Sequence, residues 1–502
     1  MLNTRRQNPR SLRWSPAPAP LPRTQTARPR VEVAPLRSAG AHPMVNREEN
    51  ALLANYEQRI KMAFDGIVPT LKRISALQHE ADFEQRAQTI ARERFGFELP
   101  QQILADAWVE QLDMRRLFAW AVFETYQGFC DEFFSTDPLG IPEGDFQEFL
   151  LGCGFHTLDI SPCADGRLAH VIRYVLRLPH RAVRRKSYAG AMFDIENSID
   201  KWTETEMLRY REGRPNTADA PTRYLKAVVY HFSSVDPDHE GCAAHGSVTE
   251  RAAQGGLDRL LAFQQAVQGS FCCGASIDLL LIGLDTDTDA IRVHLPDSDG
   301  MISLDKFVDN RALYHETQGL SVQHAEARFA QLIQDGQGRL DPGMAQLIAY
   351  LLRNNLSQIE YVREFHGEHY ADIGHAERFI GAGIGFEEVQ LRNLTYFAYL
   401  HTVEEAIADL DVGIKIFTGL NVAHGLPVPI VVRFDYHGPV PGARERAIAH
   451  CHRIDSALRA RYGDLVGRGL LHTLLVVRDC HANGLIEVLS SSAHGSSTTE
   501  TH

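Results

Sequence analysis

Asp159-Ile160-Ser161-Pro162-Cys163-Ala164-Asp165-Gly166-Arg167 is the stretch of sequence that decides the fold. Its aliphatic start predicts a strand, and the proline and glycine that follow predict a turn. In α/β sheets, ligands bind to loops at the carboxyl ends of strands, and this turn has that position. Cys163, Asp165 and Arg167 occupy alternate positions, so an extended turn could bring their side chains to one point.

A second predicted strand, Ala227 to Phe232, also ends in residues that bind metals. It contains His231, and the loop after it contains His239 and Cys242. One cysteine from the first loop, with one histidine and one cysteine from this second segment, suits tetrahedral zinc and leaves the fourth position for water. We favour His231 over His239 because His231 ends a strand, whereas His239 lies within the loop. The expected site is one zinc ion bound by Cys163, His231 and Cys242.

The two remaining polar residues of the first loop have an expected role beside such an ion. Zinc lowers the pKa of a bound water to about 7 and so gives hydroxide at neutral pH. Asp165 is expected to accept a hydrogen bond from that hydroxide and to orient it toward an electrophilic substrate. Arg167 is expected to keep Asp165 ionised, and away from the metal, through a bidentate ion pair.

His375, in Gly374-His375-Ala376-Glu377-Arg378, is a further candidate for the site. A histidine could transfer the proton whose release regenerates the hydroxide, or could hydrogen-bond to a metal ligand. A structural histidine at the start of a helix is an equally good interpretation. His156 and His245 are weaker candidates for the same role.

The rest of the chain predicts a mixed α/β (α+β) fold with several domains, because 502 residues exceed one ordinary hydrophobic core. Residues 46–138 predict a helical domain, since apolar residues recur every three or four positions from Leu53 to Ile67 and from Leu117 to Phe134. Residues 139–375 alternate strands with long helices, which favours an α/β sheet. Its other expected strands are Ile277 to Leu284 and Ala290 to Leu295, and its expected helices include Asp194 to Arg211 and Thr249 to Val267.

Residues 376–490 loosely repeat this alternation without a Cys–Asp–Arg cluster. The second alternation begins before this domain, with a helix predicted over Gln346 to Glu364. A further helix is predicted over Phe386 to Leu410, and strands over Val412 to Phe417, Pro429 to Tyr436 and Leu471 to Val477. This pattern is typical of a duplicated domain that has lost its chemistry.

The two ends of the chain differ from its body in composition. Residues 1–45 contain eight arginines and one acidic residue, Glu32, in a chain whose net charge is −13. With their alternating prolines, they predict a disordered basic arm, which is either a solvated tail or a segment that becomes ordered on an acidic protein surface or another polyanion. Residues 491–502 predict a disordered tail. No apolar run reaches about 18 residues, so we expect no membrane span, and we expect no nucleic-acid partner.

Cys163-Ala164-Asp165-Gly166-Arg167 resembles the Cys-x-Asp-x-Arg signature of β-class carbonic anhydrases, which usually have serine where this chain has Gly166. The longer run from Cys153 to Leu168 resembles one branch of that class, the carboxysome shell carbonic anhydrases. The resemblance extends over roughly residues 46–490. Its other matching stretches are Tyr188 to Gly190, Met192 to Glu196, Asn216 to Asp219, His239 to Gly246, Asp285 to Asp289, Asn355 to Gln358 and Asp372 to Arg378.

The resemblance implies an activity and a site. It implies the interconversion of carbon dioxide and bicarbonate by one zinc ion per subunit, whose ligands match Cys163, His231 and Cys242. The Asp–Arg pair of the family matches Asp165 and Arg167. The implied architecture is a helical domain, a catalytic domain and a related domain without the metal site, the last two packed as a pseudo-dimer.

The resemblance also implies a location and partners. Family members lie inside the carboxysome, on the lumen side of the shell, beside shell proteins and Rubisco. A homodimer or an assembly of dimers is expected. We expect the basic arm of residues 1–45 to bind the acidic surface of Rubisco.

Other interpretations of the same residues stay open. The zinc could be structural, with His239 or Asp165 as a fourth ligand, and the arm would then carry the function. A nucleobase deaminase is disfavoured, because Pro162-Cys163 begins its motif but the second cysteine and an upstream His-x-Glu are missing.

Two further motifs have less specific interpretations. Asp285, Asp287 and Asp289 mimic a calcium loop but lack its glycine and closing acid, so they predict a surface turn. The basic run from Arg181 to Lys186 could bind an anionic effector, and a sugar phosphate such as ribulose bisphosphate would suit a protein located beside Rubisco.

Overall fold

The structure is a computed structural model that describes residues 42–494 except for short gaps. The gaps are residues 108–109, 141–142, 180–182, 218, 271–275, 336–339, 373, 399–406 and 482–483. The expected arm and tail therefore fall almost entirely outside the described residues. His42, at the start of the described chain, is buried, and its Nε2 lies 2.9 Å from Oγ1 of Thr317. Packing thus begins before the expected boundary at residue 46.

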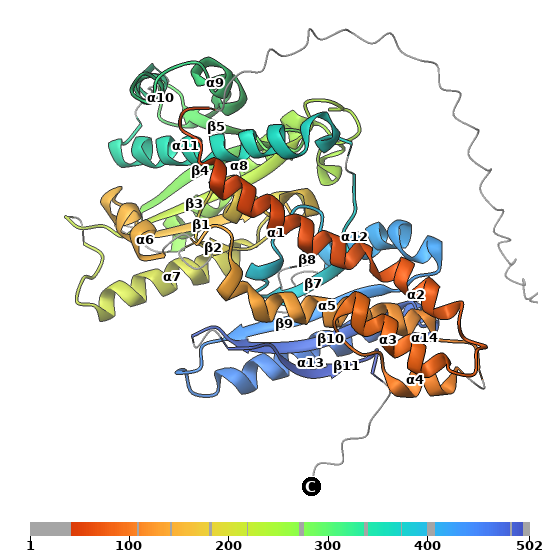
Figure 1. Ribbon diagram of the computed structural model, residues 1–502. Coiled ribbons are helices and arrows are strands. Elements are labelled where there is room, and N and C mark those ends of the chain that lie inside the picture. Colours follow the sequence, from red (N-terminus) through yellow and green to blue (C-terminus); the bar gives the residue numbers. More distant parts are fainter. Residues whose placement is uncertain are drawn as a thin grey trace, which may run out of the picture. The chain divides into compact units, whose positions relative to one another are not determined.

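A series of helices forms the N-terminal part of the described chain, as the apolar spacing predicts (Figure 1). They are α1 (Arg47–Asp65), α2 (Ile67–Ser75), α3 (Phe83–Phe95), α4 (Gln101–Asp106), α5 (Met114–Thr136) and α6 (Glu143–Gly152). The side chain of Asn46 caps α1 by accepting hydrogen bonds from the backbone N–H groups of Glu48 and Glu49. The predicted apolar stripe of α1 is confirmed, because Leu53, Tyr56, Ile60 and Phe64 are all buried.

The middle of the chain forms a six-stranded sheet in the order β2-β1-β3-β4-β5-β6. Its strands are β1 (Thr157–Pro162), β2 (Arg184–Arg185), β3 (Arg223–Phe232), β4 (Ser276–Asp285), β5 (Ile291–Pro296) and β6 (Ile302–Asp309). β2, β1, β3 and β4 are parallel, and β5 and β6 are antiparallel to their neighbours. Every residue of β3 after the first is buried, which explains its nearly continuous apolar sequence.

Helices connect and cover this first sheet. They are α7 (Ile195–Arg211), α8 (Thr249–Ser270), α9 (Asn310–Thr317), α10 (Val322–Asp335) and α11 (Pro342–Phe365), with short helical turns at Gly166–Leu168, Val171–Val175, Ala189–Ala191, Ala243–His245 and Gly367–Tyr370. One core joins the strands to α8 and α11 through buried side chains such as Phe263 and Leu351. The α/β sheet predicted for this region is confirmed.

The last part of the chain forms a second sheet of five strands in the order β11-β10-β9-β7-β8. The strands are β7 (Phe379–Ile384), β8 (Thr395–Ala398), β9 (Val428–Tyr436), β10 (Leu471–Asp479) and β11 (Glu487–Ser491). All are parallel to their neighbours except β11. The helices of this region are α12 (Ile407–Leu420), α13 (Ala443–Arg461) and α14 (Gly463–Gly467), with short turns at Glu387–Val389 and Val422–His424.

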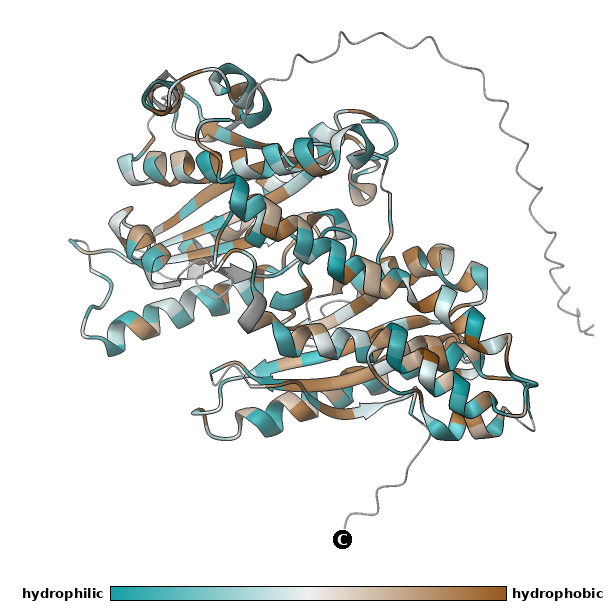
Figure 2. Ribbon diagram, viewed as in Figure 1, coloured by the Kyte–Doolittle hydropathy of each residue, from teal (hydrophilic) through white to brown (hydrophobic). Residues whose placement is uncertain are grey.

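The N-terminal helices pack against the second sheet. The ring of Phe379 on β7 lies 5.9 Å from that of Phe64 on α1 and 5.3 Å from that of Tyr126 on α5, centroid to centroid. Strand interiors and the inner faces of these helices carry the apolar residues (Figure 2). In the part of the chain that the structure describes, no helix is both long and apolar enough to cross a lipid bilayer.

Two elements expected in the last part of the chain are wrong. The helix predicted over Phe386 to Leu410 is wrong up to Ala398, where a short helical turn is followed by β8; residues 399–406 lie outside the described residues, and α12 begins at Ile407. The strand predicted over Val412 to Phe417 lies inside α12. Within the predicted strand, Gly413, Ile414 and Phe417 are buried, and the spacings of four and three positions from the first two to Phe417 are helical. The other predicted strands, over Pro429 to Tyr436 and Leu471 to Val477, are confirmed.

The turn predicted at Asp285, Asp287 and Asp289 is present, but its predicted surface location is wrong, because all three side chains are buried. Asp285 and Asp287 accept hydrogen bonds from the hydroxyls of Ser234 and Ser233. Asp289 Oδ2 lies 2.6 Å from Nε2 of His170 and 2.5 Å from the hydroxyl of Tyr370. The loop is acidic because each carboxylate has its own buried partners.

Candidate metal centre

The two sequence segments that end in metal-binding residues are neighbours in the first sheet. β1 and β3 run parallel and in register, with Pro162 opposite Val229, so their carboxyl ends meet at one edge. Cys163 directly follows β1, and its N–H donates to the carbonyl of Val229 at 3.0 Å. His231 lies near the end of β3, and Cys242 precedes the helical turn Ala243–His245.

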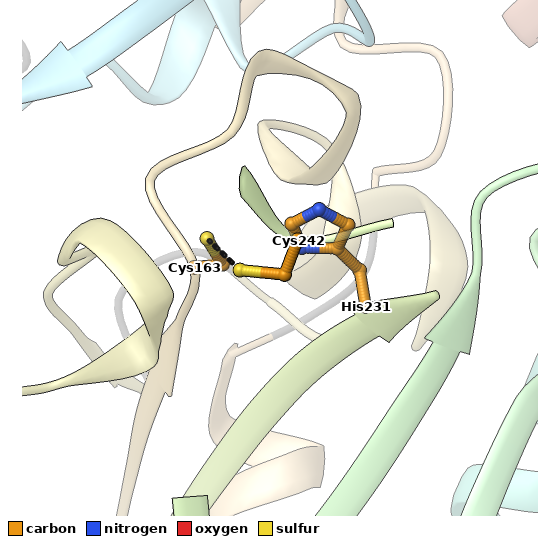
Figure 3. Close-up of side chains that lie close together, drawn as sticks. All are labelled: Cys163, His231 and Cys242. Carbon is orange, nitrogen blue, oxygen red and sulfur yellow. Dashed lines mark hydrogen bonds between the residues drawn. The ribbon is translucent and has the colours of Figure 1, made fainter. Parts of the chain in front are cut away.

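Cys163, His231 and Cys242 form a buried cluster of possible metal ligands (Figure 3). Their donor atoms all lie within 4.8 Å of one another, and the two sulfurs are 4.0 Å apart. Tetrahedral zinc with Zn–S bonds of about 2.3 Å would require a sulfur separation of about 3.8 Å. Nδ1 of His231 is buried without a hydrogen-bond partner among the described residues. The donor chemistry, the spacing and the unpaired nitrogen together fit a zinc ion.

Asp165 and Arg167 form a bidentate ion pair beside this cluster. Nε of Arg167 lies 3.0 Å from Oδ1 of Asp165, and Nη2 lies 2.8 Å from Oδ2. The backbone N–H of Arg167 donates to Oδ1 as well, at 2.9 Å. Burial alone would raise the pKa of Asp165, but the Arg167 guanidinium holds it well below its ordinary value. Asp165 is therefore a fixed carboxylate.

The ion pair also touches the cluster itself. Oδ2 of Asp165 and Nη2 of Arg167 each lie 3.4 Å from Nε2 of His231. The guanidinium reaches across to the second loop, where Nη1 donates to the carbonyl oxygen of Glu240 at 2.7 Å. Arg167 thus ties the loop after β1 to the loop after β3.

A cavity of about 390 Å³ opens over the cluster. The first sheet and its loops supply part of the wall, and the last part of the chain supplies the rest. The lining residues are Cys163, Ala164, Asp165, Ala189, Gly190, His231, Cys242, Ala243, Ala244, His375, Tyr396, Val412, Lys415 and Ile416. The site therefore needs both sheets, although the metal-ligand cluster comes from the first alone.

His375 lies in this cavity wall and is held by a buried glutamate. Its Nδ1 is 2.9 Å from Oε1 of Glu377, whose side chain has no exposed surface, whereas the His375 side chain is 39% exposed. The Glu377 hydrogen bond raises the pKa of His375, against the effect of burial, and Asp165 raises it further. His375 is thus connected to both the cavity and its surface.

The other histidines considered from the sequence lie elsewhere. The His239 side chain is 78% exposed, and its Nδ1 lies 2.8 Å from Oδ1 of Asp236. Nε2 of His245 lies 3.1 Å from the carbonyl oxygen of Gly190, and Nδ1 of His156 accepts the N–H of Arg223. None of these three belongs to the Cys163–His231–Cys242 cluster.

Sequence reasoning missed several residues of the site. Glu240 could not be found from the sequence, because it accepts a hydrogen bond from Arg167 mainly through its backbone carbonyl oxygen, which every residue has. Tyr396 lay in a segment that we expected to be helical. Glu377 follows His375 by two residues, and that proximity was the available clue.

The fold and the site define a class of protein: an α/β protein with a buried Cys–His–Cys cluster that could hold a metal ion, a fixed Asp–Arg pair and a cavity over the cluster. Three family models match the chain in order. The N-terminal domain of carboxysome shell carbonic anhydrase matches residues 42–134, the catalytic domain residues 145–375 and the C-terminal domain residues 376–493. The chain belongs to the carboxysome shell carbonic anhydrase family, which is a family of enzymes.

Individual relatives agree with the family models, and each of the three below is named carboxysome shell carbonic anhydrase. A protein of Parasynechococcus marenigrum is 58% identical over 90% of this chain and 79% of its own length. One of Prochlorococcus marinus strain MIT 9313 is 56% identical over 91% of this chain and 90% of its own. One of Halothiobacillus neapolitanus is 44% identical over 90% of both chains.

Proposed function

We propose that this chain catalyses the reversible hydration of carbon dioxide and works inside the carboxysome, where it converts bicarbonate to carbon dioxide for Rubisco. The observation that carries the proposal is the buried Cys163–His231–Cys242 cluster with a carboxylate fixed beside it. Family membership supports the reaction, and the names of the relatives support the location.

Cys163, His231 and Cys242 would hold one zinc ion per subunit. Bound zinc would supply Lewis-acid chemistry and lower the pKa of a coordinated water to about 7. Three protein donors leave one tetrahedral position for a small molecule, and the cavity lies directly over the cluster.

Asp165 would orient the attacking water by accepting a hydrogen bond from it. Arg167 occupies both carboxylate oxygens, so Asp165 keeps one orientation and stays ionised. Since an ionised carboxylate only accepts hydrogen bonds, Asp165 would hold the proton of such a water and leave its lone pair for carbon dioxide.

His375 would carry away the proton that hydration releases. It lies in the cavity wall and is partly exposed, so it can take a proton inside and lose it to buffer outside. Glu377 accepts a hydrogen bond at Nδ1 and would leave Nε2 for the proton transfer.

A purely structural metal site has less support. Structural zinc usually has four protein ligands, and the candidates for the fourth were His239 and Asp165. His239 is exposed and bonded to Asp236, and Asp165 is held by Arg167. A zinc ion with three protein ligands and a fourth position open to water is typical of a catalytic site, and the cluster fits that arrangement better than a structural one.

The expected partners rest on family membership. We propose that shell proteins, Rubisco and a second copy of the chain are partners, and that residues 1–45 bind Rubisco. Deleting those residues should abolish association with Rubisco and spare hydration, and moderate salt should weaken the contact. The proposed sugar-phosphate effector, such as ribulose bisphosphate, would bind the run from Arg181 to Lys186, part of which lies outside the described residues.

The decisive experiment combines zinc analysis with stopped-flow carbon dioxide hydration. Wild type should contain one zinc ion per chain and hydrate carbon dioxide, and Cys163→Ser and His231→Ala should lose both the metal and the activity. His239→Ala is the matched control and should keep both. Full activity in metal-free Cys163→Ser would refute the proposal.

A further inference from the structure

Tyr396 is a buried tyrosine at the wall of the cavity. It lies on β8, in the second sheet, and only 1% of its surface is exposed. Gly413 of α12 packs against the ring so closely that a β-carbon there would lie 2.8 Å from Cδ1 of Tyr396. The ring is therefore fixed between β8 and α12, beside Cys163, Asp165 and His375 in the cavity lining.

The hydroxyl of Tyr396 has no hydrogen-bond partner among the described residues, although it is buried. The buried tyrosines Tyr56 and Tyr230 do use their hydroxyls: Tyr56 donates to the carbonyl of Glu388, and that of Tyr230 lies 2.9 Å from Nε2 of His294. A buried hydroxyl without a partner costs folding free energy. Tyr396 lines the cavity, and its hydroxyl lies near enough to Cys163 and Asp165 for their charges to act on its pKa, so the unpaired group is on the side of the ring that faces the cluster.

The groups around this hydroxyl fix its protonation state. Burial raises the pKa of Tyr396 well above its ordinary value, and Asp409, Cys163 and Asp165 raise it further. The hydroxyl consequently stays protonated at neutral pH and can act as a donor. The nearby carboxylates of Asp409 and Asp165 already accept hydrogen bonds from Ala189 and Arg167.

We propose that the Tyr396 hydroxyl donates a hydrogen bond to an oxygen of bicarbonate bound in the cavity. This makes it a substrate-binding residue that the C-terminal part of the chain contributes to the site. The inference rests on the proposed function, because it assigns a contact to that substrate.

The chemistry of the cavity favours the anion as the partner. A charged oxygen accepts a much stronger hydrogen bond than the weakly polar oxygens of carbon dioxide. The rest of the wall near Tyr396 is largely aliphatic, from Ala189, Val412 and Ile416, and suits the apolar gas. Lys415, exposed in the lining, supplies a positive charge for the approach of bicarbonate. The Tyr396 hydroxyl would therefore stabilise bound bicarbonate and have little effect on bound carbon dioxide.

Removing the hydroxyl has a defined kinetic signature. Bicarbonate and the bicarbonate-like transition state would both lose the hydrogen bond, whereas bound carbon dioxide would not. The equilibrium constant of the reaction requires kcat/KM to fall by the same factor in both directions. In dehydration the loss should be a rise in KM of about tenfold with nearly unchanged kcat, as expected for a hydrogen bond to an anion. In hydration KM should stay the same, and kcat should fall.

The test is Tyr396→Phe in the full-length chain, assayed in both directions in concentrated buffer, so that proton transfer does not limit the rate. Tyr462→Phe is the matched control: its hydroxyl donates to Asp411 Oδ1 at 2.7 Å, away from the cavity lining. The control should keep wild-type kinetics. Equilibrium binding of bicarbonate, measured by calorimetry, should weaken about tenfold in Tyr396→Phe alone.

A structural role for the hydroxyl predicts a different result. Since it has no partner among the described residues, Tyr396→Phe should unfold at the wild-type temperature or higher and should keep its zinc. A lower unfolding temperature with unchanged bicarbonate KM and affinity would overturn the inference. Wild-type chain without hydration activity would instead refute the proposed function, so the two failures are distinguishable.

Discussion

The side chain of Glu377 occupies the space that a β-carbon on Gly166 would need, so that an added methyl group would clash with its Oε1. The two residues are far apart in sequence: Gly166 follows β1 of the first sheet, and Glu377 precedes β7 of the second. The N–H of Asn393 also donates to the carbonyl of Gly166, at 2.9 Å. The loop that carries Cys163 and Asp165 is thus held in place from outside the first sheet. The segment without metal ligands completes the site.

Gly166→Ser should be strongly damaging in this chain, although serine is the usual residue in the resembling β-class signature. The clash with Glu377 would shift the loop, at a cost of about 1–3 kcal/mol in unfolding free energy. A loop that has moved should also hydrate carbon dioxide more slowly. Thermal unfolding and stopped-flow hydration measure the two effects.

Glu377→Ala supplies the control for Gly166→Ser through a double-mutant cycle. If the clash causes the damage, Gly166→Ser should cost much less in the Glu377→Ala background than in wild type. Equal costs in the two backgrounds would show that the serine acts in some other way.

Glu377→Gln should change the pH dependence of the reaction while keeping the shape of the side chain. The Glu377 hydrogen bond raises the pKa of His375, so its replacement by a neutral amide should lower that pKa. If His375 carries protons, the midpoint of the kcat profile should move to lower pH, and added imidazole buffer should speed the variant more than wild type. An unmoved profile would remove His375 from the proton path.

The cluster of possible ligands could be predicted because its residues lie at the ends of recognisable strands or in the loops that follow them in the sequence. Cys163, Asp165 and Arg167 follow one strand, His231 ends another, and parallel neighbours in a sheet place their carboxyl ends together. The preference for His231 over His239 used the same argument. The structure brings His231 to the cysteines and leaves His239 exposed.

The second wall of the cavity could not be predicted, because it depends on packing between distant segments. β8, with four residues, is too short to show a strand period, so the segment around Tyr396 was expected to be a helix. The acidic loop around Asp289 was expected at the surface because its partners are remote. Arg392, whose Nη1 lies 3.7 Å from Oδ1 of Asp289, follows by about a hundred residues.

Arg167→Met should slow hydration severely without releasing the metal. Loss of the guanidinium frees Asp165, which lies 3.4 Å from Nε2 of His231 and would then bind at the fourth ligand position. The rate should fall by at least about a hundredfold, as for other losses of a group that organises the transition state. X-ray absorption spectroscopy should find a new carboxylate oxygen at zinc.

Arg167→Lys is the informative companion to that variant. Lysine keeps the charge but cannot hold both oxygens of Asp165, so its activity should lie between those of wild type and Arg167→Met. A wild-type rate of hydration in either variant would show that Asp165 does not need the bidentate ion pair with Arg167.

Asp409 should make the folded protein less stable as the pH rises from about 4 to 6. Burial raises the pKa of this carboxyl to about 6, against the N–H of Ala189, which donates to it at 2.9 Å. The folded state therefore binds a proton more tightly than the unfolded chain, whose Asp pKa is about 3.9, so stability falls between the two values.

Asp409→Asn removes this titration and keeps an oxygen for Ala189. Relative to wild type, it should gain stability between pH 4 and 6 and then hold a constant advantage of no more than about 3 kcal/mol at higher pH. Chemical denaturation at pH 4.5 and pH 7.5 measures the difference. Asp411→Asn is the matched control on the same helix: Arg461 and Tyr462 lower the pKa of Asp411, so that variant should lose stability at pH 7.5. If Asp409→Asn shows the same loss, the carboxylate is needed in its ionised form, and its burial is offset by a partner.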